Sequence, residues 1–202
     1  MSDHPTWLQL TTDDPGHSRA YIERFRRMAA QGQDLVGEAR LIDAMLGRES
    51  RVLDAGCGPG RVGGWLAGVG HEVVGVDIDP VLIAAAEEDH PGPHWIVGDL
   101  ATMDLPSLGV SEPFDAIVCA GNVMAFLEPS TRQPVLSRFA AHLRPEGGRA
   151  VVGFGAGRGY AFDAFLADAS SAGLEPELLL SSWHLRPFTD GSDFLVAILR
   201  RA

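Results

Sequence analysis

Apolar residues are spaced differently in the first quarter of the chain and in the remainder. In His17–Ala30, apolar side chains from Tyr21 to Met28 recur every three or four positions, which predicts an amphipathic helix. Asp34–Leu46 has the same spacing and predicts a second helix, with Asp34 as its N-cap. Residues 1–16 are polar and contain Asp13-Asp14-Pro15-Gly16, so they predict an arm followed by a turn.

From residue 51 onwards, short apolar runs alternate with helical stretches. The predicted strands are Arg51–Ala55, Glu72–Val76, His94–Val97, Phe114–Cys119, Arg149–Phe154, Leu178–Trp183 and Phe194–Leu199. The predicted helices are Arg61–Ala67, Pro80–Glu88, Pro129–Leu143 and Ala161–Ser171. Strands that alternate with helices predict βαβ units and an α/β fold on a mainly parallel sheet. Only Leu185–Asp193 joins the last two strands, which predicts a hairpin and an antiparallel edge.

Composition restricts the possible functions. The chain has 202 residues, with 27 acidic and 16 basic residues and a net charge of −11. The bases are all arginine, which excludes reactions that need a lysine, and the acidity argues against nucleic-acid binding. Two cysteines and seven scattered histidines show no metal-ligand spacing, so we expect no metal site. No apolar run approaches the roughly 20 residues of a membrane span. We expect no signal peptide and a cytoplasmic location.

A glycine-rich turn is the most informative segment. The strand that ends in Asp54-Ala55 runs into Gly56, Gly58 and Gly60 and then into a helix. Glycine lets the backbone turn sharply and approach a ligand, and the amides at a helix N-terminus face anionic groups. Asp77 ends the next strand, where a carboxylate can accept hydrogen bonds from both hydroxyls of a ribose. The pattern predicts a nucleoside-containing cofactor across the carboxyl ends of these two strands.

The glycine turn alone leaves three interpretations open. Gly58–Gly63 also fits the GxGxxG dinucleotide fingerprint, although it starts two residues after the strand ends. Counting from Gly56 instead places Arg61 where the third glycine belongs. A nicotinamide-dependent oxidoreductase and a structural turn without a ligand therefore remain alternatives to a site for another nucleoside-containing cofactor.

Further segments follow in a fixed order and favour one family. Asp54 precedes the glycines and can accept hydrogen bonds from amides of the loop. Asp99 and Leu100 follow the third strand, where they can form hydrogen bonds with the edge of an adenine. Phe114–Asn122 and Leu143–Gly148 come next. This set, spread over residues 51–153, strongly resembles the class I S-adenosylmethionine-dependent methyltransferases. The wider chain is also similar to a small bacterial group of these enzymes.

The resemblance implies a Rossmann-like fold with helices on both faces. Its seven strands would lie in the order third, second, first, fourth, fifth, seventh and sixth, with the seventh antiparallel. Residues 1–202 would form a single methyltransferase domain. Within it, residues 1–46 would be an arm and two cap helices across the cofactor mouth, and residues 51–202 would be the core.

The resemblance also implies S-adenosylmethionine as the cofactor and a set of binding residues. These are Tyr21, Arg40, Asp54, Gly56, Cys57, Gly58, Asp77, Ile78, Asp99, Leu100, Ala120 and Gly121. Gly56–Gly58 would line the methionine part, Asp77 would hold the ribose, and Ile78 would pack on the adenine. Carbonyl groups of Ala120-Gly121 would meet the ammonium group. Arg40, on a cap helix, could pair with the cofactor's carboxylate.

The acceptor is the least determined part of the prediction. Methyl transfer from a sulfonium is an in-line displacement in which the protein supplies alignment, and an oxygen acceptor also needs a base. The candidate catalytic residues are His184, Tyr160 and Asn122, and Arg158 could bind an acidic acceptor. We expect a small-molecule methyl acceptor and neither a nucleic-acid nor a membrane partner. A non-catalytic module that binds S-adenosylmethionine remains an alternative.

Overall fold

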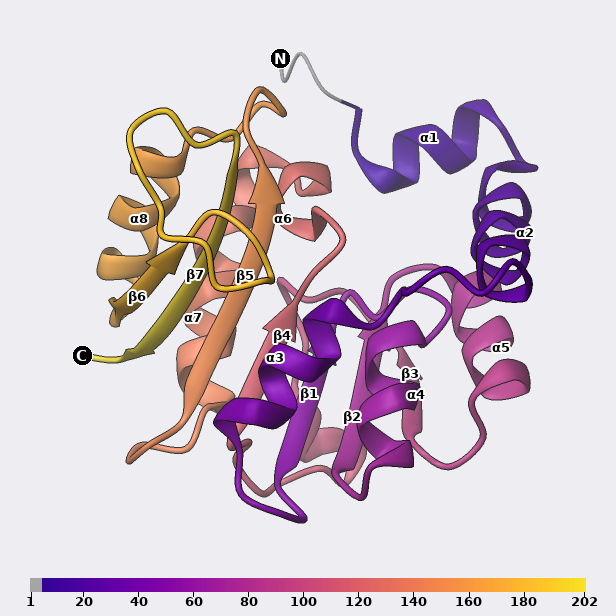
Figure 1. Ribbon diagram of the computed structural model, residues 1–202, viewed down its shortest axis with the longest axis horizontal. Coiled ribbons are helices and arrows are strands. Elements are labelled where there is room, and N and C mark those ends of the chain that lie inside the picture. The colour runs from indigo at the N-terminus through magenta and orange to yellow at the C-terminus, as the bar shows by residue number, and fades with distance from the viewer. Residues whose placement is uncertain (1–4) are drawn as a thin grey trace.

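A seven-stranded sheet with helices on both faces organises the computed structural model, which describes residues 5–202 (Figure 1). The strands are β1 Arg51–Ala55, β2 Glu72–Asp77, β3 His94–Val97, β4 Ala116–Cys119, β5 Arg149–Gly155, β6 Leu174–Leu180 and β7 Phe194–Arg201. The α-helices are α1 Trp7–Asp13, α2 His17–Ala30, α3 Gly37–Met45, α4 Arg61–Gly68, α5 Pro80–Asp89, α6 Val123–Phe126, α7 Arg132–His142 and α8 Phe162–Ser171. Two 3-10 turns are η1 Leu105–Leu108 and η2 Pro129–Thr131. None of the helices within residues 5–202 is long and apolar enough to cross a membrane.

The order of the strands confirms the predicted fold. They lie side by side as β3-β2-β1-β4-β5-β7-β6. The first five pair in parallel, and β7 runs antiparallel to both β5 and β6. Because the chain moves outward from β1 in one direction and from β4 in the other, a crevice opens beyond the carboxyl ends of these two central strands. Ligands of open α/β sheets bind at this position.

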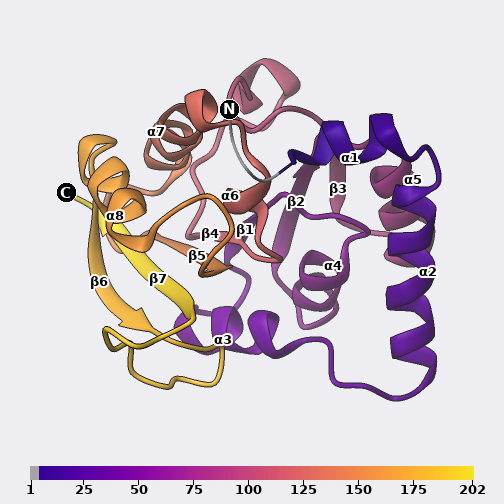
Figure 2. The same cartoon turned by 90° about the horizontal axis from the view of Figure 1, so that it is seen from above.

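Side chains of the central strands alternate between two apolar layers. Leu53, Ile117 and Val152 belong to the layer on the side of α7 and α8. Val52, Val118 and Val151 belong to the layer on the side of α3 and α4. Viewed from above, α3 and α4 cover one face of the sheet and α7 and α8 the other (Figure 2). Burial on both faces accounts for the nearly continuous apolar runs from which the strands are predicted.

The N-terminal segment differs from its prediction. Trp7–Asp13 form helix α1, whereas the sequence pattern predicts an arm and a turn over residues 1–16; residues 1–4 lie outside the described residues. The helix starts with a capping box, in which the Thr6 hydroxyl accepts from Gln9 N at 3.2 Å and Gln9 Oε1 accepts from Thr6 N at 2.8 Å. No residue of α1 is buried, so apolar periodicity gives no signal for it.

Two helices near the N-terminus pack differently. Helix α2 lies beside α5, and Arg26 pairs there with Glu88 and Asp89 at 2.9 and 2.8 Å (Figures 1 and 2). Helix α3 lies against α4 and begins at Gly37, with Val36 rather than the predicted Asp34 as its N-cap. Helix α2 is therefore attached to α5, at the β3 end of the sheet, whereas α3 also packs in the apolar layer that contains residues of β1, β4, β5 and β7.

Candidate functional site

A cavity of about 200 Å³ lies at the carboxyl ends of β1, β2, β3 and β4, with α1 and α2 contributing to its wall. Every residue predicted to bind the cofactor lines this cavity except Arg40. The cavity thus brings together groups from four strand ends and from the second helix. Further residues in its wall are Thr6, Trp7, Leu8, Phe25, Pro59, Arg61, Val62, Leu82, Gly98, Val123, Phe126, Leu127, Glu128 and Thr131.

The glycine turn forms the floor of the cavity, and its conformation requires glycine. Gly56 has φ +78°, and a Cβ atom at this position would lie 2.4 Å from Cγ2 of Val123. The Gly56 and Cys57 amides both donate to the Val76 carbonyl, at 2.8 and 3.1 Å, which fixes the turn against β2. Gly60 has φ +80° and starts α4 in the left-handed region. The backbone can therefore approach a ligand closely at this point.

Asp54 lies beneath the glycine turn and is fully buried. Its Oδ2 accepts a hydrogen bond from Gly63 N at 2.8 Å, in the first turn of α4. Burial raises the pKa of this carboxyl to about 7, although the nearby Arg61 guanidinium favours the ionised form. Asp54 consequently connects β1 to α4 and has a charge that changes near neutral pH.

Asp77 and Asp99 end the neighbouring strands. Asp77 Oδ2 accepts from Gly58 N at 2.8 Å and Oδ1 accepts from Asp79 N at 3.0 Å. Burial raises the pKa of Asp77 despite these bonds. Each carboxylate oxygen has two acceptor positions, so Asp77 retains capacity for hydroxyl groups of a ligand. Asp99 Oδ1 accepts from Ala101 N at 2.9 Å, which orders the segment after β3.

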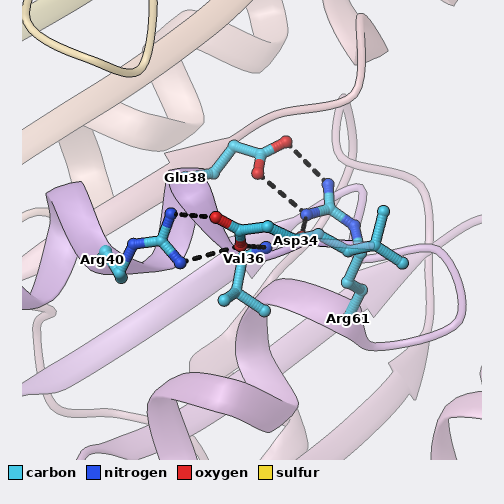
Figure 3. Close-up of polar contacts among 6 residues, drawn as sticks. Asp34, Val36, Glu38, Arg40 and Arg61 are labelled. Carbon is cyan, nitrogen blue, oxygen red and sulfur yellow. Dashed lines mark hydrogen bonds and ion pairs between the residues drawn. The ribbon is translucent and has the colours of Figure 1, made fainter. Parts of the chain in front are cut away.

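Two arginines, one on α3 and one on α4, lie differently with respect to the cavity. Arg61 lines the cavity, and its Nη1 and Nη2 donate to both carboxylate oxygens of Glu38 at 2.8 and 2.7 Å (Figure 3). Arg40 instead pairs with Asp34 on the surface at 2.6 Å (Figure 3). Arg40, predicted to pair with the cofactor's carboxylate, lies outside the cavity wall, because its neighbours Ala39 and Leu41 occupy the buried side of α3 and leave Arg40 exposed.

None of the three candidate catalytic residues lines the cavity. Tyr160 is buried in the core, where its hydroxyl donates to Asp168 at 2.6 Å and its pKa is raised by burial. Asn122 adopts φ +65°, and its Oδ1 accepts from Gly155 N at 2.9 Å, so it supports β5. His184 lies exposed in the loop between β6 and β7. The structure therefore does not bring these residues together at the site.

Sequence reasoning missed an aromatic part of the cavity wall. The Trp7 ring of α1 lies 5.3 Å from the Tyr21 ring and 5.8 Å from the Phe126 ring, measured between centroids. Its Nε1–H donates to Asp79 Oδ2 at 2.8 Å. The Thr6-x-x-Gln9 capping box was the available signal for the helix that carries Trp7.

The cysteines of the chain are poorly suited to act as nucleophiles, and the described residues form no group that could bind a metal ion. Cys57 lines the cavity and Cys119 lies in β4, both buried, and burial raises the pKa of each thiol. A thiol with a raised pKa is a poor nucleophile at neutral pH. Within residues 5–202, no three His, Cys, Asp or Glu side chains are grouped so as to hold a metal ion.

Comparisons with known proteins show which family the chain is similar to. A family described as a methyltransferase domain matches residues 52–147. The crystal structure of a TehB-like SAM-dependent methyltransferase from Corynebacterium glutamicum is 50% identical, with a TM-score of 0.87, and the match covers 94% of this chain and 100% of that one.

Other similar proteins are more distant in sequence. The magnesium-protoporphyrin O-methyltransferase of Rhodobacter capsulatus is 34% identical over 131 residues, which are 61% of this chain and 53% of that protein. The chain thus spans about half the length of this curated relative. A magnesium protoporphyrin IX methyltransferase from Synechocystis, solved with bound SAM, is 18% identical with a TM-score of 0.62, covering 97% of this chain and 84% of that one.

Proposed function

The chain belongs to the class I S-adenosylmethionine-dependent methyltransferases, and from this premise we propose that it methylates a small molecule bound in the cavity beneath α1. S-adenosylmethionine is the cofactor of the family. The observation that carries the proposal is the convergence of Asp54, Asp77 and Asp99 with the glycine turn on this one cavity.

The cofactor's adenosine would lie towards β2 and β3. In this arrangement Asp77 accepts the ribose hydroxyls and Ile78 packs on the adenine, whose edge meets Asp99 and the Leu100 amide. These side chains follow neighbouring parallel strands, so they occupy one side of the same cavity. Asp77 keeps free acceptor positions for this purpose.

The methionine part would lie over the glycine turn. Gly56–Gly58 approach it through their backbone, and the Ala120 and Gly121 carbonyls at the end of β4 accept from the ammonium group. Arg61 takes the place predicted for Arg40 as partner of the carboxylate, because it lines the cavity directly after the turn. Glu38 holds the guanidinium in position through two hydrogen bonds.

A small acceptor fits the cavity better than a macromolecule. The α1 residues Trp7 and Leu8 form part of the cavity wall, which leaves a confined space rather than an open platform. The net charge of −11 repels polyanions such as RNA or DNA. Bound here, the cofactor supplies an activated methyl group, while the chain's own residues align the reactants and exclude water.

Parallel calorimetric titrations test the proposal. We expect S-adenosylmethionine and S-adenosylhomocysteine to bind and NAD not to bind. Incubation with cofactor labelled in the methyl group and a cell extract should then place the label in the low-molecular-weight fraction. NAD binding without S-adenosylmethionine binding would support the oxidoreductase alternative. Cofactor binding without any transfer of label would support a non-catalytic module.

A further inference from the structure

Aromatic rings from three helices gather in the cavity wall. Trp7 of α1, Tyr21 and Phe25 of α2, and Phe126 of α6 all line it. The Tyr21 and Phe25 rings lie 4.9 Å apart, and Trp7 contacts both Tyr21 and Phe126. Trp7, Phe25 and Phe126 are not among the residues predicted to bind the cofactor, whereas Tyr21 is. Faces of aromatic rings attract cations, and the attraction is strongest where water is excluded.

One carboxylate beside these rings has no partner. Glu128 lines the cavity two residues after Phe126 and is exposed to solvent, and among the described residues no hydrogen bond or ion pair engages its side chain. Its backbone carbonyl accepts from both Thr131 N and Thr131 Oγ1 at 2.9 Å, which fixes the segment. By contrast, Asp54, Asp77 and Asp99 each accept from backbone amides.

The cavity is therefore unsuited to an anionic acceptor. Arg61 is the one basic residue in its wall among residues 5–202, and its proposed partner is the carboxylate of the cofactor, so no second cation remains for an anionic acceptor. Arg158, considered as a ligand for an acidic acceptor, does not line the cavity. The net charge of −11 adds a field that attracts cations.

We propose that the acceptor is an amine, whose ammonium form is held by the carboxylate of Glu128 and the aromatic rings of Trp7 and Phe126. This inference rests on the proposed methyl transfer. For reaction, the ammonium loses one proton to the Glu128 carboxylate, which passes it to water. The nitrogen lone pair then bonds to the methyl carbon while the carbon–sulfur bond breaks and its electron pair stays on sulfur. The products are the methylated ammonium and S-adenosylhomocysteine.

Matched probes test the class of acceptor. Binding of 2-phenylethylamine, its neutral analogue 2-phenylethanol and the anion 3-phenylpropionate is measured by calorimetry in the presence of saturating S-adenosylhomocysteine. We expect the amine to bind roughly tenfold or more tightly than the alcohol, the scale of a charge-assisted hydrogen bond. Glu128→Gln should remove this preference. Glu23→Gln, at an exposed position of α2 outside the cavity wall, should preserve it.

The outcomes separate this inference from the proposed function. If S-adenosylhomocysteine itself does not bind, the proposed function fails and this inference fails with it. If S-adenosylhomocysteine binds but the alcohol or the acid binds as tightly as the amine, only the amine inference is overturned. The amine inference alone is also overturned if no probe binds, or if Glu128→Gln keeps the full preference for the amine.

Discussion

Trp7 and Asp79 are 72 residues apart in the chain, yet the indole Nε1–H of Trp7 donates to Asp79 Oδ2 at 2.8 Å. The same oxygen accepts from the Ser18 hydroxyl at 2.5 Å, and Oδ1 accepts from Val81 N at 2.8 Å. One carboxylate therefore caps α5 and anchors both α1 and α2. Because α1 has no buried residue of its own, Trp7 provides its main attachment to the rest of the protein.

We predict that α1 moves to admit ligands and that the Trp7–Asp79 hydrogen bond controls this movement. The cavity of about 200 Å³ is smaller than the roughly 300–1,000 Å³ typical of small-molecule sites. Trp7→Phe keeps an aromatic ring but removes the donor, which costs about 1 kcal/mol and favours opening by roughly fivefold. Amide hydrogen exchange of residues 7–13 should accelerate accordingly, and S-adenosylhomocysteine should dissociate faster in stopped-flow measurements.

Thr12→Ala is the matched control, because Thr12 is exposed on the same helix and does not line the cavity. It should leave the dissociation rate unchanged. Equal dissociation rates for the Trp7→Phe variant and the unmodified protein would show that this hydrogen bond does not govern ligand exchange.

A second prediction separates the two arginines near α3. Arg61→Ala should raise the dissociation constants of S-adenosylmethionine and S-adenosylhomocysteine by roughly tenfold to a hundredfold, the scale of about 1.5–3 kcal/mol for a shielded charge-assisted bond. Arg40→Ala removes the same charge from an exposed pair with Asp34 and should change either constant little. Calorimetric titration of both variants decides the point. A loss of affinity in the Arg40 variant alone would reverse the assignment.

The strands were predictable because burial leaves a direct pattern of apolar residues in the sequence. Val52, Leu53 and Ile117 lie in a sheet that is covered on both faces, so their apolar character is required by the fold. The resemblance to a known family supplied the strand order. The glycine turn was predictable for the same kind of reason, since a Cβ atom on Gly56 would collide with Val123.

The positions of several side chains near the site depend on tertiary contacts, which leave no comparable pattern in the sequence. Arg40 and Arg61 both have apolar neighbours in the sequence, so the sequence does not show which of them lines the cavity. The packing of α3 on α4 decides this. Tyr160 looks available beside a glycine-rich segment, but its ring stacks on Phe154 and its hydroxyl meets Asp168. The position of Trp7 likewise follows from its hydrogen bond to Asp79, a contact between residues 72 apart in the chain.

A third prediction tests whether Asp77 binds the ribose, by comparing ligands that have and lack the ribose hydroxyl groups. Asp77→Asn should abolish discrimination between adenosine and 2′,3′-dideoxyadenosine, because the amide can no longer accept hydrogen bonds through both of its terminal atoms. The unmodified protein should favour adenosine by about 1.5–3 kcal/mol, measured by competition against S-adenosylhomocysteine. Asp77 also accepts from Gly58 N and Asp79 N, so a general loss of stability is expected too. Such a loss would weaken both ligands alike, whereas retained discrimination would assign the ribose to another residue.

The fourth prediction concerns the pH dependence of stability that Asp54 creates. Its carboxyl has a pKa of about 7 in the folded protein, because burial disfavours the charge, against roughly 3.9 for an aspartate in an unfolded chain. Between these values the folded state binds more protons than the unfolded state, so the free energy of unfolding falls as the pH rises. The contribution is fully present below about pH 4 and is lost as the pH approaches 7, with a slope of up to about 1.4 kcal/mol per pH unit.

Asp54→Asn removes the titration while its amide oxygen can still accept from Gly63 N. Urea unfolding at a series of pH values should therefore show the unmodified protein losing stability relative to this variant from pH 4 to 7 and no further relative change above that range. The exposed Asp190→Asn variant should follow the unmodified protein throughout. A constant difference between the Asp54→Asn variant and the unmodified protein across the whole range would mean that Asp54 stays ionised in its buried position.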